Sequence, residues 1–442
     1  MRSDKPDFLA WFLPGLEIKR WLFLMFSGTV FLITGIAIIL DLHPIHQFME
    51  FIKIVAVKLP TGYTGGFAIL LGIMIYILGW KRVNNTIINA IDPGAHLLEN
   101  LYLKRKLNRG PKIITIGGGT GLNTILKGLK HITGNLTAVV TVGDDGGSSG
   151  RLREEMGVLP PGDIRNCIAA LANEENLVTE LFQYRFKNGH GLEGHSFGNL
   201  FLTALCAITG DMVSAVKESS KVLAIRGRVL PSTLDDMKLF AELEDGRIVY
   251  GESNIPDACG KIKRLGATPD NLKALDDVIY AIEDADIIIM GPGSLYTSVI
   301  PNLLISEITK AISVSTAKKI YICNIMTQPG ETDNYSVYDH VKAILDHSKH
   351  ENIIDTVLIN DTLPENLANK YKEANSFPVK HDLEKIKELG IKVLIRRLID
   401  ENSEGLVRHS AKRITRIIYS WYKASDKHSS DETCEFCEEH DD

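Results

Sequence analysis

Two adjacent carboxylates, Asp144 and Asp145, end an apolar run and lead into a stretch of glycine and serine that reaches Arg151. Carboxylates can hold Mg²⁺ or accept hydrogen bonds from sugar hydroxyls. The amides and hydroxyls of a Gly/Ser loop, together with a guanidinium, suit a phosphate group. The alternative is a solvated turn, but a flexible stretch this rich in Gly and Ser is costly to order. The candidate ligand-binding residues are Asp144, Asp145, Gly146, Gly147, Ser148, Ser149 and Arg151, with Asp144 and Asp145 as candidate Mg²⁺ ligands.

A glycine-rich turn at residues 117–121 follows another apolar run. Glycines let the backbone approach a phosphate closely, and the start of a following helix supplies N–H donors and partial positive charge. The spacing does not match the dinucleotide fingerprint, because Leu122 stands where a third glycine is needed, and no Gly-Lys-Ser/Thr makes it a P-loop. The alternative is a tight turn into a helix. The candidates are Gly118, Gly119, Thr120 and Gly121.

Two more polar turns, residues 291–298 and 324–332, each follow an apolar run. Their Ser and Thr hydroxyls can cap a helix or bind phosphate, and Tyr296 is placed to stack on a base. The candidates are Gly291, Gly293, Ser294, Tyr296, Thr297, Asn324, Thr327, Gln328, Glu331 and Thr332. Several anion-binding turns on one sheet edge predict a large phosphorylated ligand such as a nucleotide, without specifying its base or a reaction.

Weaker polar clusters occupy residues 160–166 and 194–199. Asp163 is as good an N-cap as a ligand, and a lone histidine such as His195 is more often structural than catalytic. The candidates are Asp163, Asn166, His195 and Asn199. No nucleophile–base pair shows the spacing of a catalytic triad. In the tail, Cys434, Cys437 and His440 supply three zinc ligands without a fourth nearby; the alternative is an acidic, disordered tail.

The elements that must position these residues alternate between short β-rich runs and helical stretches. Non-alternating apolar strands are typical of a parallel sheet that is buried on both faces. The expected strands are 112–116, 136–142, 286–290, 319–324, 355–360 and 391–395, and the expected helices are 121–130, 164–172, 199–208, 212–223, 272–283, 338–347 and 407–422. Residues 237–243 and 247–252 flank Asp245-Gly246, the preferred pair of a type I′ turn. The sequence therefore predicts an α/β fold: a Rossmann-like, doubly wound, mostly parallel sheet with a hairpin insertion.

Two uncharged stretches, residues 21–40 and 59–80, precede this domain. Each is about as long as a helix needs to cross roughly 30 Å of hydrocarbon. A cleaved signal peptide would be shorter and would end in small residues, and buried core helices of this length rarely lack every charge. Residues 45–57 between the spans have an apolar helical face that fits a membrane surface, with a plain loop as the alternative.

The distribution of Lys and Arg sets the orientation. Four precede residue 21, two lie between the spans and seven lie within residues 81–112. The positive-inside rule then predicts a two-pass protein of the cell membrane with both termini and the main domain in the cytoplasm. The expected organisation is a membrane hairpin at 1–80, a juxtamembrane linker at 81–110, the α/β domain at 111–425 and an acidic tail at 426–442.

The amino-acid composition limits the classes of partner that the chain is expected to bind. The chain has 442 residues with 49 Lys+Arg and 55 Asp+Glu, a net charge of −6. The tail holds eight acids and one Lys, so it contributes −7 and leaves about +1 for the rest. No domain-scale basic surface follows, which argues against a nucleic-acid partner. Six cysteines are too few for a disulfide framework and are expected to be reduced thiols.

In order along the chain stand IITIGGGTGL, VGDDGGSSGRLR, PPGDIRN, GHSFGNL, GPGSLYTS-x-x-PNL and CNIMTQPGET. This series resembles the gluconeogenesis-factor family of bacteria, the YvcK/CofD-like relatives of 2-phospho-L-lactate transferase. The resemblance covers residues 111 to about 422 and implies a Rossmann-like domain that binds a nucleotide-type ligand. The membrane hairpin is not part of the family's minimal form.

In the gluconeogenesis-factor branch the resemblance implies a UDP-sugar ligand, notably UDP-N-acetylglucosamine, and a regulatory role that matches envelope synthesis and cell shape to carbon supply. The transferase branch moves a phospholactyl group from a nucleotide diphosphate donor to a deazaflavin, with Mg²⁺. The Gly/Ser stretch after Asp145 resembles the regulatory branch, since the transferases carry a bulkier aromatic segment there. Asp163 matches an acid found in both branches. Arg408 lies in a segment resembling the branch's Arg-His-Asp motif, with Ser410 in place of the Asp, and is a candidate contact for phosphate or uracil.

The resulting hypothesis is a membrane-tethered UDP-sugar sensor that does not turn its ligand over. The alternative is a transferase that moves a phospholactyl-like group from a nucleotide diphosphate donor to an acceptor, with Mg²⁺. Expected partners are the UDP-sugar or a related nucleotide, membrane lipid and envelope-synthesis or regulatory proteins, and a second copy of the chain is a further candidate.

The charge asymmetry predicts the side of the membrane on which the main domain lies. A reporter fused after Arg109 should be active only on the cytoplasmic side, because the six Lys and Arg of residues 81–109 resist translocation. The measurement is paired reporters that are active on opposite sides of the membrane. Activity on the outer side would contradict the orientation.

Overall fold

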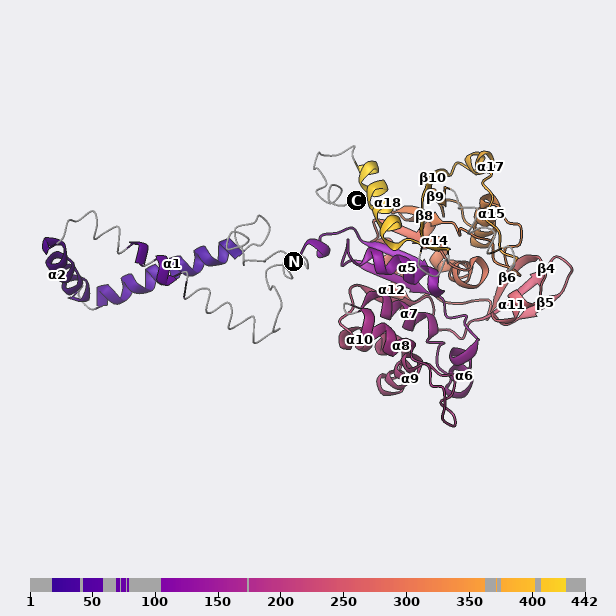
Figure 1. The fold of residues 1–442 in the computed structure, drawn as a ribbon, viewed down its shortest axis with the longest axis horizontal. Coiled ribbons are helices and arrows are strands. Elements are labelled where there is room, and N and C mark those ends of the chain that lie inside the picture. Colours follow the sequence, from indigo (N-terminus) through magenta and orange to yellow (C-terminus); the bar gives the residue numbers. More distant parts are fainter. Residues whose placement is uncertain are drawn as a thin grey trace. The chain divides into compact units, whose positions relative to one another are not determined.

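The computed structural model describes residues 18–39, 43–58, 69–71, 73–76, 78, 105–172, 175–361, 371, 375–401 and 407–426 (Figure 1). The chain divides into two units, Met1–Lys106 and Leu107–Asp442. Most of the predicted linker at 81–110, much of the second predicted span, and the tail with Cys434, Cys437 and His440 lie outside the described residues.

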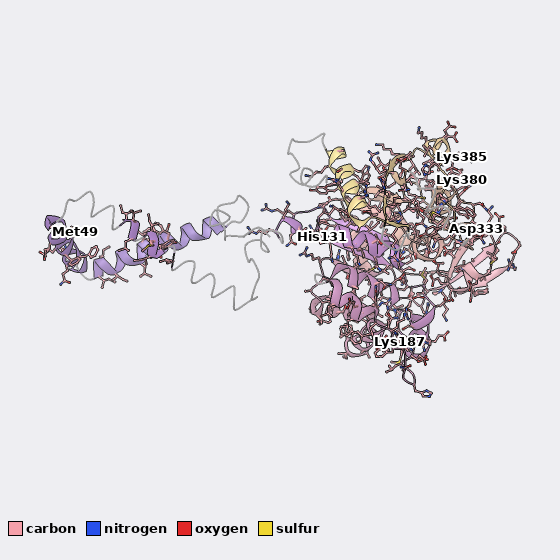
Figure 2. The ribbon with its side chains drawn as sticks, in the orientation of Figure 1. Met49, His131, Lys187, Asp333, Lys380 and Lys385 are labelled. Atoms are coloured by element: carbon pink, nitrogen blue, oxygen red, sulfur yellow. The ribbon has the colours of Figure 1, made fainter. Side chains whose placement is uncertain are left out.

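The N-terminal unit contains the helices α1 (Ile18–Ile39) and α2 (His43–Lys58). α1 covers most of the first predicted span, and the second is helical at its described positions 69–71, 73–76 and 78. α2, marked by Met49 in Figure 2, forms where the sequence shows an apolar helical face. When only described residues are considered, no single helix is long and apolar enough to cross a bilayer, and one bent pair, α9 (Phe197–Thr209) with α10 (Met212–Val222), meets the requirements of length and composition.

The C-terminal unit is built on a seven-stranded sheet with the order β10-β9-β8-β7-β1-β2-β3. Every neighbouring pair in it is parallel. The strands are β1 (Ile113–Gly117), β2 (Leu136–Val140), β3 (Arg228–Pro231), β7 (Ile287–Met290), β8 (Lys318–Ile322), β9 (Thr356–Asn360) and β10 (Lys392–Arg396). The predicted doubly wound parallel fold is confirmed.

The order of strands reverses between β1 and β7, because the chain builds outward from β1 to β3 and then returns to pair β7 with β1. Parallel connections are right-handed, so the two halves place their helices on opposite faces of the sheet. β1, β2 and β7 are buried at every position, as expected for a sheet that is covered on both sides.

The helices of this unit pack against one another as well as against the sheet. α5 packs against both α7 and α18, and α12 packs against α14 (Figure 1). Besides α9 and α10 they are α5 (Gly119–Leu129), α6 (Gly147–Met156), α7 (Gly162–Leu171), α8 (Glu175–Gln183), α11 (Asn254–Asp257), α12 (Asp276–Glu283), the π-helix η2 (Leu295–Val299), α13 (Ile300–Leu303), α14 (Ser306–Val314), α15 (Val337–Ser348), α17 (Leu383–Glu388) and α18 (Ala411–Asp426).

The predicted hairpin is confirmed and is larger than expected. β4 (Lys238–Leu243) and β5 (Ile248–Tyr250) pair antiparallel, and Gly246 in their turn has a φ of +87°. β6 (Ile262–Thr268) adds a third strand on the other side of β4. The short helix α11 connects β5 to β6 within this insertion sheet.

Two local predictions were wrong. The Gly/Ser stretch after Asp145, expected to be a flexible loop, begins the helix α6 at Gly147. The helix forms because Leu152 and Arg153 on its inner face are buried against the domain, which compensates for the poor helix propensity of its first turn. The expected helix 407–422 instead starts as β12 (Val407–His409), which pairs with β11 (Ile399–Glu401), before α18 begins.

The packing of α18 on α5 needs a glycine at position 128. A Cβ there would lie 2.6 Å from the backbone oxygen of Ala411 and would also collide with the Thr415 hydroxyl. Gly128→Ala should therefore lower the free energy of unfolding by about 1–3 kcal/mol, because backbone must shift to make room. The measurement is thermal or urea unfolding of the full chain.

Gly157→Ala is the control for glycine loss without crowding, since nothing lies within 4 Å of a Cβ there but its φ is +64°. Gly157→Ala should lower the free energy of unfolding by about 1 kcal/mol, which is the cost of a left-handed backbone for alanine. Equal stability of Gly128→Ala and the unmodified chain would mean that the two helices are not packed as described.

Candidate functional site

The Gly-rich turns after β1 and β7 meet at the point where the strand order reverses. A Cβ on Gly121 would collide with the backbone oxygen of Pro292, and one on Gly118 would collide with the carboxylate of Asp163. Only glycine at positions 118 and 121 leaves room for these close contacts. The predicted turn 117–121 and the start of the predicted turn 291–298 thus form one continuous backbone surface at the carboxyl edge, the usual ligand position of such folds.

Beside this surface lies a polar cavity of about 310 Å³, here called the Asp144 cavity. It opens at the ends of β1 and β2 and is framed by the first turns of α6 and α7. Its lining residues are Asp144, Gly146, Gly147, Ser148, Ser149, Gly162, Asp163, Arg165, Asn166, Arg185 and Asn199. Eight of these were predicted from the sequence; Gly162, Arg165 and Arg185 were not.

Two arginines give the Asp144 cavity its positive charge. Arg165 is only 8% exposed, and its guanidinium donates to Ser196 Oγ at 2.6 Å and Asn166 Oδ1 at 2.8 Å. Its Nε is buried without a hydrogen-bond partner among the described residues. Burial, followed by the charge of Arg185, lowers the pKa of Arg165. A buried guanidinium with an unmatched donor is suited to an anion.

Two carboxylates face the same cavity. Asp163, in the first turn of α7, accepts a hydrogen bond from the backbone N–H of Gly119, and burial together with the charge of Asp144 raises its pKa to about 6. Asp144 accepts from the N–H of Gly146 at 2.9 Å. The site therefore carries both signs of charge, with donors for phosphate and acceptors for hydroxyls.

The neighbouring carboxylates Asp144 and Asp145 have separate surroundings. Asp145 accepts from the backbone N–H of Ser253 at 2.9 Å and lies against Gly251, so it fixes the insertion sheet and does not line the cavity. Asp144 shares the cavity with Asp163 instead. Among the described residues, no three His, Cys, Asp or Glu side chains cluster closely enough to hold a metal ion. Two carboxylates completed by ligand phosphates are nevertheless a donor set that fits Mg²⁺.

Ser148, His195 and Asn199 form a network on the cavity wall that the sequence spacing did not reveal. Ser148 Oγ lies 3.0 Å from His195 Nδ1, and Asn199 Nδ2 donates to Ser148 Oγ at 3.1 Å. His195 is 3% exposed, and burial, followed by the charge of Arg151, lowers its pKa. The network holds the first turn of α6, whose residues line the cavity, in a fixed position.

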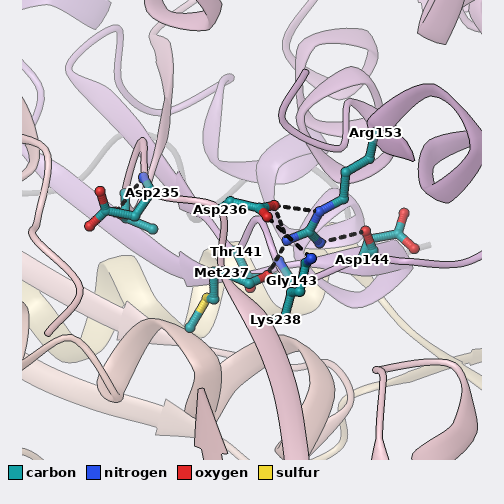
Figure 3. Close-up of polar contacts among 9 residues, drawn as sticks. Thr141, Gly143, Asp144, Arg153, Asp235, Asp236, Met237 and Lys238 are labelled. Carbon is teal, nitrogen blue, oxygen red and sulfur yellow. Dashed lines mark hydrogen bonds and ion pairs between the residues drawn. The ribbon is translucent and has the colours of Figure 1, made fainter. Parts of the chain in front are cut away.

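Of the two arginines on α6, the one that the sequence singled out points away from the cavity. Arg151 donates to the backbone oxygen of Glu193 at 2.8 Å, in the loop marked by Lys187 in Figure 2. Arg153 instead donates to Asp236 Oδ1 at 2.6 Å and to the backbone oxygen of Met237 at 2.5 Å (Figure 3). Arg153 thus ties α6 to the insertion sheet.

The predicted residues on the turns after β7 and β8 mostly bind one another. Asn324 Nδ2 donates to the Gly293 oxygen at 2.9 Å, and Gln328 Nε2 donates to Ser294 Oγ at 2.8 Å. Thr332 Oγ1 accepts from the Gln328 N–H at 2.8 Å, and Thr327 Oγ1 accepts from the N–H of Phe377 at 3.0 Å. These bonds lock the two turns together beside the switch point.

Tyr296 does not have the surroundings of a base-stacking residue. It is 2% exposed, its hydroxyl lies 2.8 Å from that of Tyr335, and its ring packs edge-on against His347. Burial raises its pKa, so it stays neutral. In this structure Tyr296 is a core residue.

Arg408 lies on β12 opposite Asp400 and is exposed. It does not line the Asp144 cavity. Its neighbour His409 instead contacts the backbone of Cys323 at the end of β8, and burial lowers the pKa of this histidine to about 4.

Two further acids approach the site from other segments. Glu331 is 6% exposed and accepts from the Tyr296 N–H and the Thr297 hydroxyl, while burial raises its pKa to about 7. Glu252, carried by the insertion sheet, was not predicted; burial and then the charges of Asp144 and Asp163 raise its pKa to about 8. No local sequence motif identifies Glu252, because Asp144 and Asp163 are distant in sequence and come near it only in the folded chain.

A reversed-order parallel sheet with touching glycine turns and a polar cavity at its carboxyl edge defines a Rossmann-like α/β protein, a class whose ligands usually bind at this edge. The family model described as 2-phospho-L-lactate transferase CofD matches residues 113–399. The chain belongs to this family, which confirms the resemblance seen in its motifs.

Within this family, the chain is similar to proteins named as gluconeogenesis factors. It is 51% identical over 424 residues to a gluconeogenesis-factor relative of Nostoc, covering 94% of this chain and 93% of that protein. It is 48% identical to the gluconeogenesis factor of Bacillus subtilis, covering 72% of this chain and 100% of that protein. A crystal structure of a Bacillus halodurans protein, 47% identical, superposes with a TM-score of 0.68 over 70% of this chain and 100% of its own.

The raised pKa of Asp163 predicts a pH-dependent stability. Its folded pKa of about 6 exceeds the ordinary value of 3.8, so its ionisation favours the unfolded chain, at a cost fully present above pH 6 and lost as pH falls toward 4. Asp163→Asn should therefore raise the free energy of unfolding by about 1–3 kcal/mol at pH 8 and leave it nearly unchanged at pH 4. The measurement is urea unfolding across pH 4–8.

Asp270→Asn is the matched control, because Asp270 is exposed on the loop after β6. It should shift stability little at any pH. A stabilisation by Asp163→Asn that is the same at pH 4 and pH 8 would contradict the assigned pKa.

Proposed function

We propose that this chain binds a UDP-sugar, with UDP-N-acetylglucosamine as the first candidate, across the glycine turns and the Asp144 cavity. We further propose that it acts as a regulatory protein of the gluconeogenesis-factor type, which links carbon metabolism to envelope synthesis and cell shape. Membership of the family and the gluconeogenesis factors among its relatives support this assignment.

The observation that carries the proposal is the mixed chemistry of one cavity. Arg165 and Arg185 supply cationic donors for phosphate, and Asp144 and Asp163 supply acceptors for sugar hydroxyls. The glycine turns beside it bring backbone N–H groups close to a diphosphate. A purely structural role would not require a buried arginine donor, Arg165 Nε, to stand without a partner among the described residues.

Membrane attachment is part of the proposal. Residues 21–40 carry no charge, and α1 is helical over 22 residues, Ile18–Ile39. Its described apolar side chains include Phe31 and Ile39, which are exposed within the chain and would contact lipid. The proposed arrangement is a two-pass anchor with the α/β domain in the cytoplasm.

A transferase is the second candidate, and the paired acids of the cavity favour it. Asp144 and Asp163 would hold Mg²⁺, which on binding would neutralise phosphate charge. The Ser148–His195 contact at 3.0 Å adds a hydroxyl beside an imidazole whose pKa is lowered.

Calorimetry of the full chain in detergent against UDP-N-acetylglucosamine, UDP-glucose and free UDP separates the two candidates. We expect binding that chelator changes little and ligand that is recovered unchanged after long incubation. Asp144→Asn should weaken binding about 10-fold, as loss of a charged acceptor typically does, whereas Asp270→Asn should not. Steady release of UDP by catalytic amounts of protein would favour the transferase, and absence of binding would refute the ligand assignment.

A further inference from the structure

A second cavity, here called the Asp361 cavity, lies at the carboxyl ends of β8 and β9 and has a volume of about 340 Å³. It is on the opposite side of the switch point from the Asp144 cavity, because β8 and β9 lie beyond β7 in the sheet. None of the functions discussed above uses it. Apart from Asn324, no residue of its lining was predicted to contact a ligand.

The lining has two kinds of side chain. The apolar side chains are Ile325, Ile359, Pro378 and Val379, and the polar ones are Asn324, Asn360, Asp361 and His381. The described lining includes no Lys or Arg, in contrast to the Asp144 cavity with its two arginines. With one histidine and one carboxylate as the only ionisable groups of its described lining, this pocket is less suited to phosphate than the Asp144 cavity, and it suits a flat, neutral group with hydrogen-bonding edges.

The walls of the Asp361 cavity are held in place by backbone pairing. Val379 N–H donates to the Ile325 oxygen at 3.0 Å, and Thr327 N–H donates to the Phe377 oxygen at 2.7 Å. Lys380, labelled in Figure 2, directly follows this paired segment. The floor is fixed by Asn360, whose Oδ1 accepts from the Leu398 N–H at 2.9 Å. The cavity is therefore preformed, which is typical of a ligand pocket.

Asn324 connects this cavity to the glycine turns. It lines the cavity, and its side chain exchanges two hydrogen bonds with the backbone of Gly293, at 3.2 and 2.9 Å. From β2 to β9 the sheet order crosses four strand intervals, about 19 Å at 4.8 Å each. A nucleotide-sugar in an extended form can bridge this edge, with its diphosphate over the glycine turns between the two cavities.

We propose that the Asp361 cavity binds the nucleobase, while the sugar end of the ligand occupies the Asp144 cavity. This inference rests on the proposed function and assigns the two ends of its ligand to the two cavities. The apolar walls contact the faces of the base, and Asp361 accepts a hydrogen bond from a ring N–H. Uracil and guanine have such an N–H on their pairing edge and adenine does not, so Asp361 selects between base classes.

The test compares ligands with and without the base on the full chain in detergent, by calorimetry. Asp361 is exposed at the mouth of the cavity, so Asp361→Ala should fold normally. It should weaken UDP-N-acetylglucosamine about 10-fold or more and leave N-acetylglucosamine 1-phosphate, which lacks the base, unchanged. Asp270→Ala should alter neither. UDP-sugar methylated at uracil N3 should bind the unmodified chain about as weakly as the normal ligand binds Asp361→Ala.

Four outcomes would overturn the assignment or separate it from the proposed function. An equal loss for both ligands, or no loss for UDP-N-acetylglucosamine, would show that the cavity does not bind the base. Binding of GDP but not of UDP-sugars, weakened by Asp361→Ala, would support the base pocket and refute the proposed ligand. Failure of the unmodified chain to bind any of these nucleotides would refute both.

Discussion

The contact between the glycine turns of β1 and β7 is the constraint on which the rest of the domain depends. Gly121 touches the backbone of Pro292, and no side chain fits between them. Because the two strands are neighbours where the strand order reverses, this contact leaves an uninterrupted strip of backbone along the carboxyl edge. The two cavities lie on opposite sides of that strip, which is why the proposed ligand has one end assigned to each.

The insertion sheet has a role that its position in the sequence does not suggest. Arg153 on α6 donates to Asp236 at the start of the insertion, and Asp145 in the loop after β2 accepts from the backbone of Ser253 within it. These two bonds join the insertion to α6 and to the loop after β2. A further contact, between Gly330 and Pro256, joins it to the loop after β8. The insertion is thereby held at both halves of the main sheet, and it delivers Glu252 among the acids of the site.

Local signals allowed much of this architecture to be predicted. The apolar runs gave six strands of the main sheet within a few residues, but β3 was missed because it is four residues long and includes Arg and Pro. The glycine turns and Asp144 were recognisable because their chemistry is contiguous in sequence. The Ser148–His195 pair and Glu252 were not, since their partners lie 47 or more residues away. The prediction that Tyr296 stacks on a base was wrong for the same reason. An aromatic residue in a polar turn is a reasonable stacking candidate, but in the folded chain Tyr335 and His347 pack against it.

Charge balance explains how one edge can hold several acids and still receive an anion. Burial raises the pKa of Asp163 to about 6, of Glu331 to about 7 and of Glu252 to about 8, so near neutral pH these groups are partly protonated and can donate hydrogen bonds. Arg165, whose charge interacts with Asp163 and Asp144, has a donor unmatched by any described residue. An incoming diphosphate would draw the acids further toward their protonated forms, since a nearby negative charge raises a carboxyl pKa. Binding of an anion here would therefore be linked to proton uptake by the same burial that makes the acids costly to ionise.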